Sequence, residues 1–250
     1  MLAQLKLELE ADKPEFGYYQ STNMQGVLME QIDSGYAQRL HEQGLKPYSQ
    51  YLLGRGQRIC WVVNTLSQES YEQIIMPLMK GTFTEFALDK KDIHVKILGR
   101  ELHTTAKQEL LKEFYSDSCD RYLHLEFLTP TAFKSNRKYM IMPDVRYIYQ
   151  SLMNKYSASS PDMEMYDSET LEQLAGGTDI AGYRLKSDSF PLEGIRIPSF
   201  RGELSIRVSG TDTMARYARL LARFGEYSGV GIKTAMGMGG FRIRKREARS

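Results

Sequence analysis

Histidine is the residue type in this chain best suited to moving protons near neutral pH, and the chain has only four of them. His41 falls at the end of a short helical stretch, where the helix dipole favours the protonated imidazolium. That position suits a group that takes up and returns a proton during catalysis, although an inert helix histidine is the alternative interpretation. His94 and His103 have no neighbouring pattern that assigns them a role.

The most unusual stretch of the sequence is a glycine-rich segment near the C-terminus. Five glycines fall within the twelve residues from Gly229 to Gly240. Glycine loses more backbone freedom on folding than any other residue, so this density needs a physical reason. One reason is a backbone that approaches a phosphate or a base closely with its N–H groups, and the other is a tight helix-to-strand connection. The Walker motif fails because Ile232 precedes Lys233, and the dinucleotide motif fails because Thr234 stands where a glycine is needed.

Basic residues gather in the same part of the chain. From Arg196 to Ser250 there are 12 lysines and arginines against 4 acidic residues, whereas the first 195 residues carry 21 basic and 27 acidic ones. Arginines recur on one face of the last predicted helix and on one face of the last predicted strand: Arg216, Arg219, Arg223, Arg242 and Arg244. A basic end on an otherwise acidic chain indicates an anionic partner, with a solvated surface as the alternative.

The elements that position these residues follow from hydrophobic periodicity. Strands are predicted at residues 5–9, 47–51, 58–64, 93–97, 122–127, 183–185, 204–208 and 241–243. Helices are predicted at 24–32, 34–42, 71–79, 145–156 and from Thr211 or Asp212 to Gly225. The stretches 100–120 and 157–179 are predicted to be connecting loops.

This order gives β-α-β-β-α-β twice in succession. It predicts an α+β fold of tandem ferredoxin-like (RRM-like) domains, each an antiparallel sheet backed by two helices. The domains are predicted to cover residues 1–118 and 119–250. The segment from Gly229 to Gly239 then joins the last helix to the last strand of the second domain.

Composition excludes several classes of protein. The 250 residues are 42% hydrophobic and 26% charged, which excludes global disorder. No apolar run approaches the roughly 18 residues of a membrane helix, and the N-terminus has no apolar signal core. Two cysteines, Cys60 and Cys119, make no CxxC pair. We therefore expect a cytoplasmic protein without a membrane partner.

The glycine-rich segment carries a specific resemblance. It reads Gly-Val-Gly from 229 to 231, then five residues that include Lys233, then Gly-Met-Gly from 237 to 239. This resembles in full the glycine-rich loop of the CRISPR-associated endoribonucleases that mature CRISPR RNA, which belong to the RAMP superfamily. Residues 40–49 and 127–133 resemble the same family, so the resemblance spans nearly the whole chain.

The resemblance implies a reaction that needs neither metal nor cofactor. In the family, the 2′-hydroxyl upstream of the scissile phosphate attacks it, giving a 2′,3′-cyclic phosphate and a 5′-hydroxyl. Such a reaction needs proton transfer, for which histidine is suited, and positive charge to stabilise the phosphorane. The resemblance implies that His41 is the catalytic histidine. Lys46, just past Gly44, matches a lysine that some members use, and a solvated loop charge is its alternative.

A third catalytic group is less well matched. Some members of the family use a tyrosine from the first helix, and Met29 stands at the matching place here. Tyr36 lies five residues before His41 and could either take over this role or pack in the core.

The resemblance also implies that the loop and its basic neighbours bind RNA. The expected RNA-binding residues are Gly229, Gly231, Lys233, Thr234, Gly237, Gly239, Arg207, Arg216, Arg219, Arg223, Arg242 and Arg244. Contacts of this kind to phosphates add affinity but little sequence preference. Tyr122 and His124 share the polar face of a strand and could add an RNA-facing surface, or be ordinary exposed residues.

Three functions are compatible with these observations. The first is a metal-independent endoribonuclease that cuts CRISPR repeat RNA, with the second domain gripping RNA and the first cutting it. The second is a non-catalytic RNA-binding RAMP subunit of a CRISPR effector complex. The third is an enzyme that binds a small phosphate compound. His41 and Lys46 favour the first, and the failed phosphate motifs count against the third. The expected partner is CRISPR repeat RNA, and an effector complex or a second copy of the chain is also considered.

Overall fold

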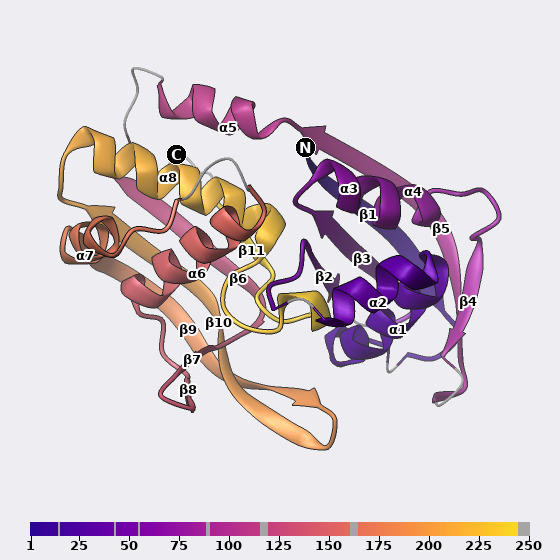
Figure 1. The fold of residues 1–250 in the computed structure, drawn as a ribbon. Coiled ribbons are helices and arrows are strands. Elements are labelled where there is room, and N and C mark those ends of the chain that lie inside the picture. The colour runs from indigo at the N-terminus through magenta and orange to yellow at the C-terminus, as the bar shows by residue number, and fades with distance from the viewer. Residues whose placement is uncertain are drawn as a thin grey trace, which may run out of the picture.

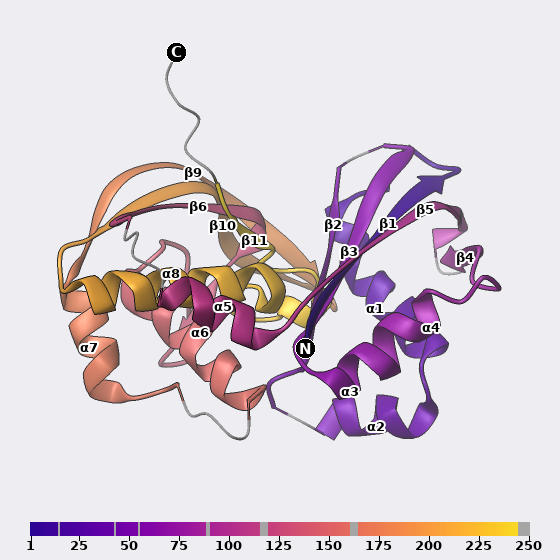
Figure 2. The same ribbon diagram turned by 90° about the horizontal axis from the view of Figure 1, so that it is seen from above.

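The structure is a computed structural model that describes residues 1–14, 16–42, 44–54, 56–88, 91–115, 120–160 and 165–244. Two antiparallel sheets lie next to each other, and Figure 2 shows both on one side of the molecule with most helices on the other. The predicted α+β fold of tandem ferredoxin-like domains is confirmed. The predicted boundary between residues 118 and 119 lies outside the described residues.

The first sheet has the strand order β2-β3-β1-β5-β4. Its strands are β1 (Leu2–Ala11), β2 (Tyr48–Leu53), β3 (Arg58–Thr65), β4 (Glu85–Leu88) and β5 (Ile93–Thr105). It is covered by η1 (Tyr18–Gln20), α1 (Ser21–Gln31), α2 (Ser34–Glu42) and a continuous helical segment of α3 (Gln68–Ser70), η2 (Tyr71–Ile75) and α4 (Met76–Leu78). Leu5, Leu7 and Leu9 of β1 are fully buried beneath these helices, as their alternation predicts.

The second sheet has the strand order β11-β6-β10-β9, the same relative order as its counterparts in the first. Its strands are β6 (Tyr122–Thr131), β9 (Thr178–Leu192), β10 (Ile195–Val208) and β11 (Phe241–Ile243). Its helices are α6 (Val145–Ala158), α7 (Ser168–Gly176), α8 (Asp212–Ser228) and the short η4 (Thr234–Met236). A small hairpin of β7 (Phe133–Ser135) and β8 (Lys138–Met140) follows β6.

Several predicted elements need correction. The stretches predicted as loops contain the end of β5, α5 (Lys107–Phe114) and α7. The predicted strands 183–185 and 204–208 are parts of a much longer β9–β10 hairpin. The predicted helix end at Gly225 is also wrong, because α8 continues to Ser228. Gly225 allows α8 to pack closely against α6, since a Cβ at this position would lie 2.9 Å from Leu152 Cδ2.

The two domains share a packed interface. A buried cluster combines Leu2 and Leu66 of the first domain with Tyr156, Leu220 and Phe224 of the second. Burial of this apolar surface fixes how the two sheets are placed, which in turn fixes where the glycine-rich segment meets the first domain. Within the described ranges, no helix is long and apolar enough to span a bilayer.

Candidate functional site

The glycine-rich segment forms a closed loop between α8 and β11, shown in yellow in Figure 1. Gly229, Gly231, Gly237 and Gly239 all have positive φ angles, between 63° and 110°. The two ends of the loop meet where the Val230 N–H donates to the Gly239 carbonyl at 2.9 Å. Positive φ is open to glycine at little steric cost, so the four glycines are first of all a requirement of this backbone path.

The second half of the loop docks into the first domain. The amide of Gln50 in β2 donates to the carbonyls of Ser21 (2.7 Å) and Ala235 (3.2 Å), and accepts from the Trp61 indole at 2.9 Å. A Cβ on Gly237 would lie only 2.1 Å from the Cβ of Ser21. Residues 234–239 therefore hold the two domains together, and we call them the latch.

The first half of the loop faces a cavity of about 330 Å³ at the domain interface. Lys46 reaches this cavity from the first domain, and Gly231 and Lys233 reach it from the second. Burial lowers the pKa of Lys46, and the positive charge of Lys233 lowers it further. Two cations that face the same space repel each other, and an anion bound between them would offset this repulsion.

Lys233 is held in an uncommon backbone conformation, with φ of 56°. Its carbonyl accepts from the N–H groups of Met236 (2.9 Å) and Met238 (3.3 Å). Lysine rarely adopts left-handed backbone angles, and these two hydrogen bonds stabilise that conformation at Lys233. The position of this lysine on the loop is therefore fixed by the fold.

A second cavity, of about 290 Å³, adjoins the first along Leu45, Gly231 and Ile232. It is lined by Phe133 and Lys134 and by one face of α6 that carries Tyr147, Gln150, Ser151 and Asn154. Ser151 Oγ accepts from the Gly231 N–H at 2.9 Å, which ties the loop to α6. Lys155 lines both cavities. Among the described residues, neither cavity has an aspartate or glutamate in its lining.

His41 lies at the exposed C-terminal end of α2, next in the chain to Leu40. The Leu40 carbonyl accepts a hydrogen bond from the Lys46 ammonium group. Lys46 therefore folds back toward the C-terminal end of α2, where His41 is the next residue along the chain. The short α2–β2 connection places the Lys46 ammonium group against the backbone of the residue that precedes His41.

Tyr36 is placed differently. Its side chain is buried in the core of the first domain, and its hydroxyl has no hydrogen-bond partner among the described residues. Burial, reinforced by the nearby Glu69 carboxylate, raises its pKa to about 12. Because the side chain is buried among core residues, the structure favours the packing role for Tyr36 over the catalytic one.

The glycines and arginines predicted to bind RNA do not share one surface. Gly231 and Lys233 line the cavity, whereas Gly229, Gly237 and Gly239 are buried packing positions, and Thr234 is buried at the cavity wall. The arginines are mostly ion-paired, in the pairs Arg242–Glu126 (2.7 Å), Arg244–Glu203, Arg223–Glu226 (2.5 Å) and Arg219–Asp120 (3.5 Å). Arg216 is half-buried and Arg207 is exposed. Helical spacing could show only Glu226, which lies three residues after Arg223 on α8; the other three carboxylates come from outside the element that carries their arginine.

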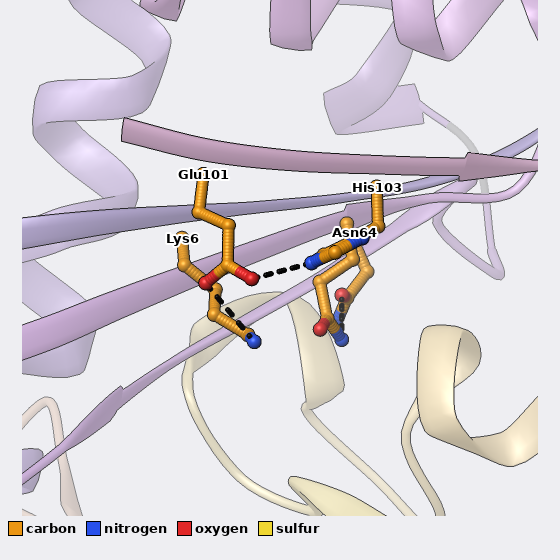
Figure 3. A network of polar contacts seen from close by, with 5 residues as sticks. Lys6, Asn64, Glu101 and His103 are labelled. Carbon is orange, nitrogen blue, oxygen red and sulfur yellow. Dashed lines mark hydrogen bonds and ion pairs between the residues drawn. The ribbon is translucent and has the colours of Figure 1, made fainter. Parts of the chain in front are cut away.

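On the sheet faces that point away from the helices, which we call the open faces, basic side chains also pair with carboxylates. Phe241 and Ile243 pack toward the core, so Arg242 and Arg244 lie on the opposite face, where His124 contacts Ser205 Oγ at 2.8 Å. Figure 3 shows the matching face of the first sheet. There Glu101 contacts both Lys6 and His103, and these two hydrogen bonds lower its pKa, with His103 the larger cause.

Tandem ferredoxin-like domains with a glycine-rich loop before the last strand define a RAMP-type fold, and the described lining of its interface cavity holds lysines and no acidic residue. A family model described as CRISPR-associated endoribonuclease Cas6 matches residues 125–241. The chain is 36% identical to a Cas6 endoribonuclease of Mycobacterium tuberculosis over 247 residues, covering 97% of this chain and 78% of the relative. It is 36% identical to that of Streptococcus thermophilus over 223 residues, covering 89% and 90%. The chain belongs to the Cas6 family of CRISPR-associated endoribonucleases and is an enzyme that cuts RNA.

Solved structures agree on the fold. A Cas6 product complex has a TM-score of 0.80 at 24% identity, covering 98% of this chain and all of that one. A structure of Thermus thermophilus Cas6 has a TM-score of 0.72 at 24% identity, covering 98% of each chain.

Proposed function

We propose that this enzyme cuts CRISPR repeat RNA in precursor transcripts, without a metal, at the interface between its two domains. The observation that carries the proposal is the cavity lined by both Lys46 and Lys233, with no acidic side chain in its described lining. Lys46 also bonds the Leu40 carbonyl, and Leu40 is the residue before His41. Such a cavity suits the phosphate of a polyanion. The names of its relatives support RNA as the substrate.

The chemistry follows from these groups. His41 takes the proton from the 2′-hydroxyl as that oxygen bonds to phosphorus. The bond from phosphorus to the 5′-oxygen then breaks, and the imidazolium returns the proton to that oxygen. Lys46 and Lys233 stabilise the negative charge that builds up on the phosphorane. The products are a 2′,3′-cyclic phosphate and a 5′-hydroxyl.

Two substrates in EDTA test this mechanism. We expect the enzyme to cut repeat RNA in EDTA at the rate seen with magnesium present, and to leave uncut the same RNA with 2′-deoxyribose at the cleavage position. The nucleophile is then missing, although the phosphates that bind the protein remain. Cleavage of the deoxy substrate, or loss of cleavage in EDTA, would overturn the mechanism. If neither RNA is cut but both bind, the chain acts as a binding subunit instead.

Lys46→Met tests the charge on the first-domain side. It should lower the cleavage rate by about 10² to 10³, because one group that stabilises the developing charge is lost. Burial and the charge of Lys233 lower the pKa of Lys46, so Lys46 loses its proton at a lower pH than an ordinary lysine does. The cleavage rate of the parent should therefore begin to fall at that lower pH. Single-turnover rates between pH 6 and 10 measure both effects.

A matched control is Lys6→Met, which removes an exposed lysine that pairs with Glu101 at 3.3 Å on the open sheet face. It should cut at the parent rate. If Lys46→Met also cuts at the parent rate, Lys46 has no part in charge stabilisation.

A further inference from the structure

Lys155 is a buried lysine at the boundary between the two cavities. Its side chain leaves α6 on the same apolar face as Leu152 and Tyr156, and only 6% of the residue is exposed. Its ammonium group reaches the Gly229 carbonyl at 3.0 Å and the Ser228 carbonyl and Thr234 Oγ1 at 3.4 Å each. All three partners are neutral, so no charge among these contacts compensates that of the lysine.

Among the described residues, the charged groups that line the two cavities are all cations. Lys46 reaches the cavities from the α2–β2 connection, Lys134 from β7 and Lys233 from the loop. The face of α6 beside Lys155 contributes the uncharged Ser151 and Asn154, and α8 contributes the Ser228 carbonyl. Burial lowers the pKa of Lys155 to about 7.

We propose that Lys155 is a positioning and charge-supplying residue of the RNA site, whose buried ammonium group holds the first turn of the glycine-rich loop and gains its counter-charge from the bound RNA phosphate. This inference rests on the proposed function. Burying a cation without an acidic partner lowers the stability of the folded protein. We infer that Lys155 offsets this cost by a function in the RNA-bound state. An anion in the adjoining cavity favours the charged form, so RNA binding draws a proton onto Lys155.

The structure also says what loss of the lysine would do to the fold. Methionine fills nearly the same volume without a charge, and the Gly229 carbonyl keeps its bond from Ser228 Oγ at 2.9 Å. Lys155→Met should therefore unfold at the same temperature as the parent or higher, and yet bind RNA more weakly. If Lys155 had a merely structural role, Lys155→Met would instead melt at a lower temperature and bind RNA as tightly as the parent.

The experiment measures binding of repeat RNA with 2′-deoxyribose at the cleavage position, from pH 6.5 to 9, in a His41→Ala background that lacks the histidine assigned to proton transfer. The parent of this series should lose affinity as pH rises above about 7, by at most tenfold per pH unit, because the free protein then has a neutral Lys155 that must be protonated. Lys155→Met should bind about tenfold to a hundredfold more weakly at pH 6.5, with a difference that narrows by pH 9. Calorimetry in two buffers of different ionisation enthalpy should show proton uptake near pH 7.5 that Lys155→Met removes.

Lys107→Met is the matched control. Lys107 is a second lysine with a pKa lowered by burial, to about 8, and it donates to Ser159 and Ser160 just past the C-terminal end of α6, outside the described lining of both cavities. Its replacement should leave the pH dependence of RNA binding unchanged. If Lys155→Met keeps the proton uptake and the pH slope of its parent, the inference is wrong while the proposed function stands. If the parent binds no repeat RNA at all, the proposed function itself fails.

Discussion

Replacement of His41 with alanine should lower the rate of repeat-RNA cleavage by about 10² to 10⁴ and change repeat-RNA affinity by no more than a few-fold. His41 is exposed at the end of α2, so its loss leaves no cavity in the core. The phosphate contacts that we assign to Lys46 and Lys233 remain in the variant. His41→Ala should therefore slow the chemical step while leaving RNA affinity nearly unchanged.

Single-turnover cleavage and a binding titration on the same RNA make the measurement. His103→Ala is the control, because that histidine is also exposed but contacts Glu101 on the open face of the first sheet. It should cut at the parent rate. Cleavage by His41→Ala at the parent rate would show that another group moves the protons, and weaker binding with no change in the chemical step would make His41 a binding residue only.

Replacement of Gly237 with alanine should produce the largest loss of stability among the substitutions considered. The added Cβ would lie 2.1 Å from the Cβ of Ser21, and the residue has φ of 110°, which side chains disfavour. Ser21 is fully buried and its hydroxyl donates to the Tyr18 carbonyl at 2.6 Å, so it cannot easily move away. Overpacking and backbone strain together should lower the free energy of unfolding by about 2 to 5 kcal/mol.

For a chain of this length, that loss corresponds to a fall in melting temperature of about 4 to 20 °C. Gly26→Ala is the control, because Gly26 lies within α1 and nothing surrounds the position within 4 Å. It should raise stability by about 0.5 to 1 kcal/mol through helix propensity. Thermal unfolding of the three proteins decides the matter, and equal melting of Gly237→Ala and the parent would contradict the close packing of the latch against α1.

The parts of the fold that follow from local periodicity were predictable. The helix at residues 34–42 matches α2 at both ends. Of the two predicted starts for α8, Asp212 is the first helical residue, and Thr211 is the N-cap whose side chain accepts from the Met214 N–H. Both sheets have the strand order expected of ferredoxin-like domains. Helices α5 and α7 were missed although their apolar residues have helical spacing, because they are only 8 and 9 residues long and lie within stretches whose polar and glycine content predicted loops.

The candidate site was predictable only in part, because its chemistry depends on partners far away in the chain. The arginines of α8 do share one face, yet Asp120, which lies two residues before β6, pairs with Arg219, and helical periodicity could not show this partner. Lys155 was missed, although a signal exists: it is a charged residue on the apolar face of the helix, three residues after Leu152. A lysine at such a position is rarely buried without a reason.

Gln50 has a consequence for the molecule as a whole. Its buried amide bonds to Ser21, Trp61 and Ala235, and the last of these partners belongs to the other domain. If the second half of the chain were removed, the first would lose this partner and expose the surface that covers Ala235 and Gly237. The two sheets repeat one topology, but neither half is a self-contained module. We therefore expect the chain to unfold cooperatively as one thermodynamic unit, in which any ligand that tightens the loop also raises the stability of the domain on the other side of it.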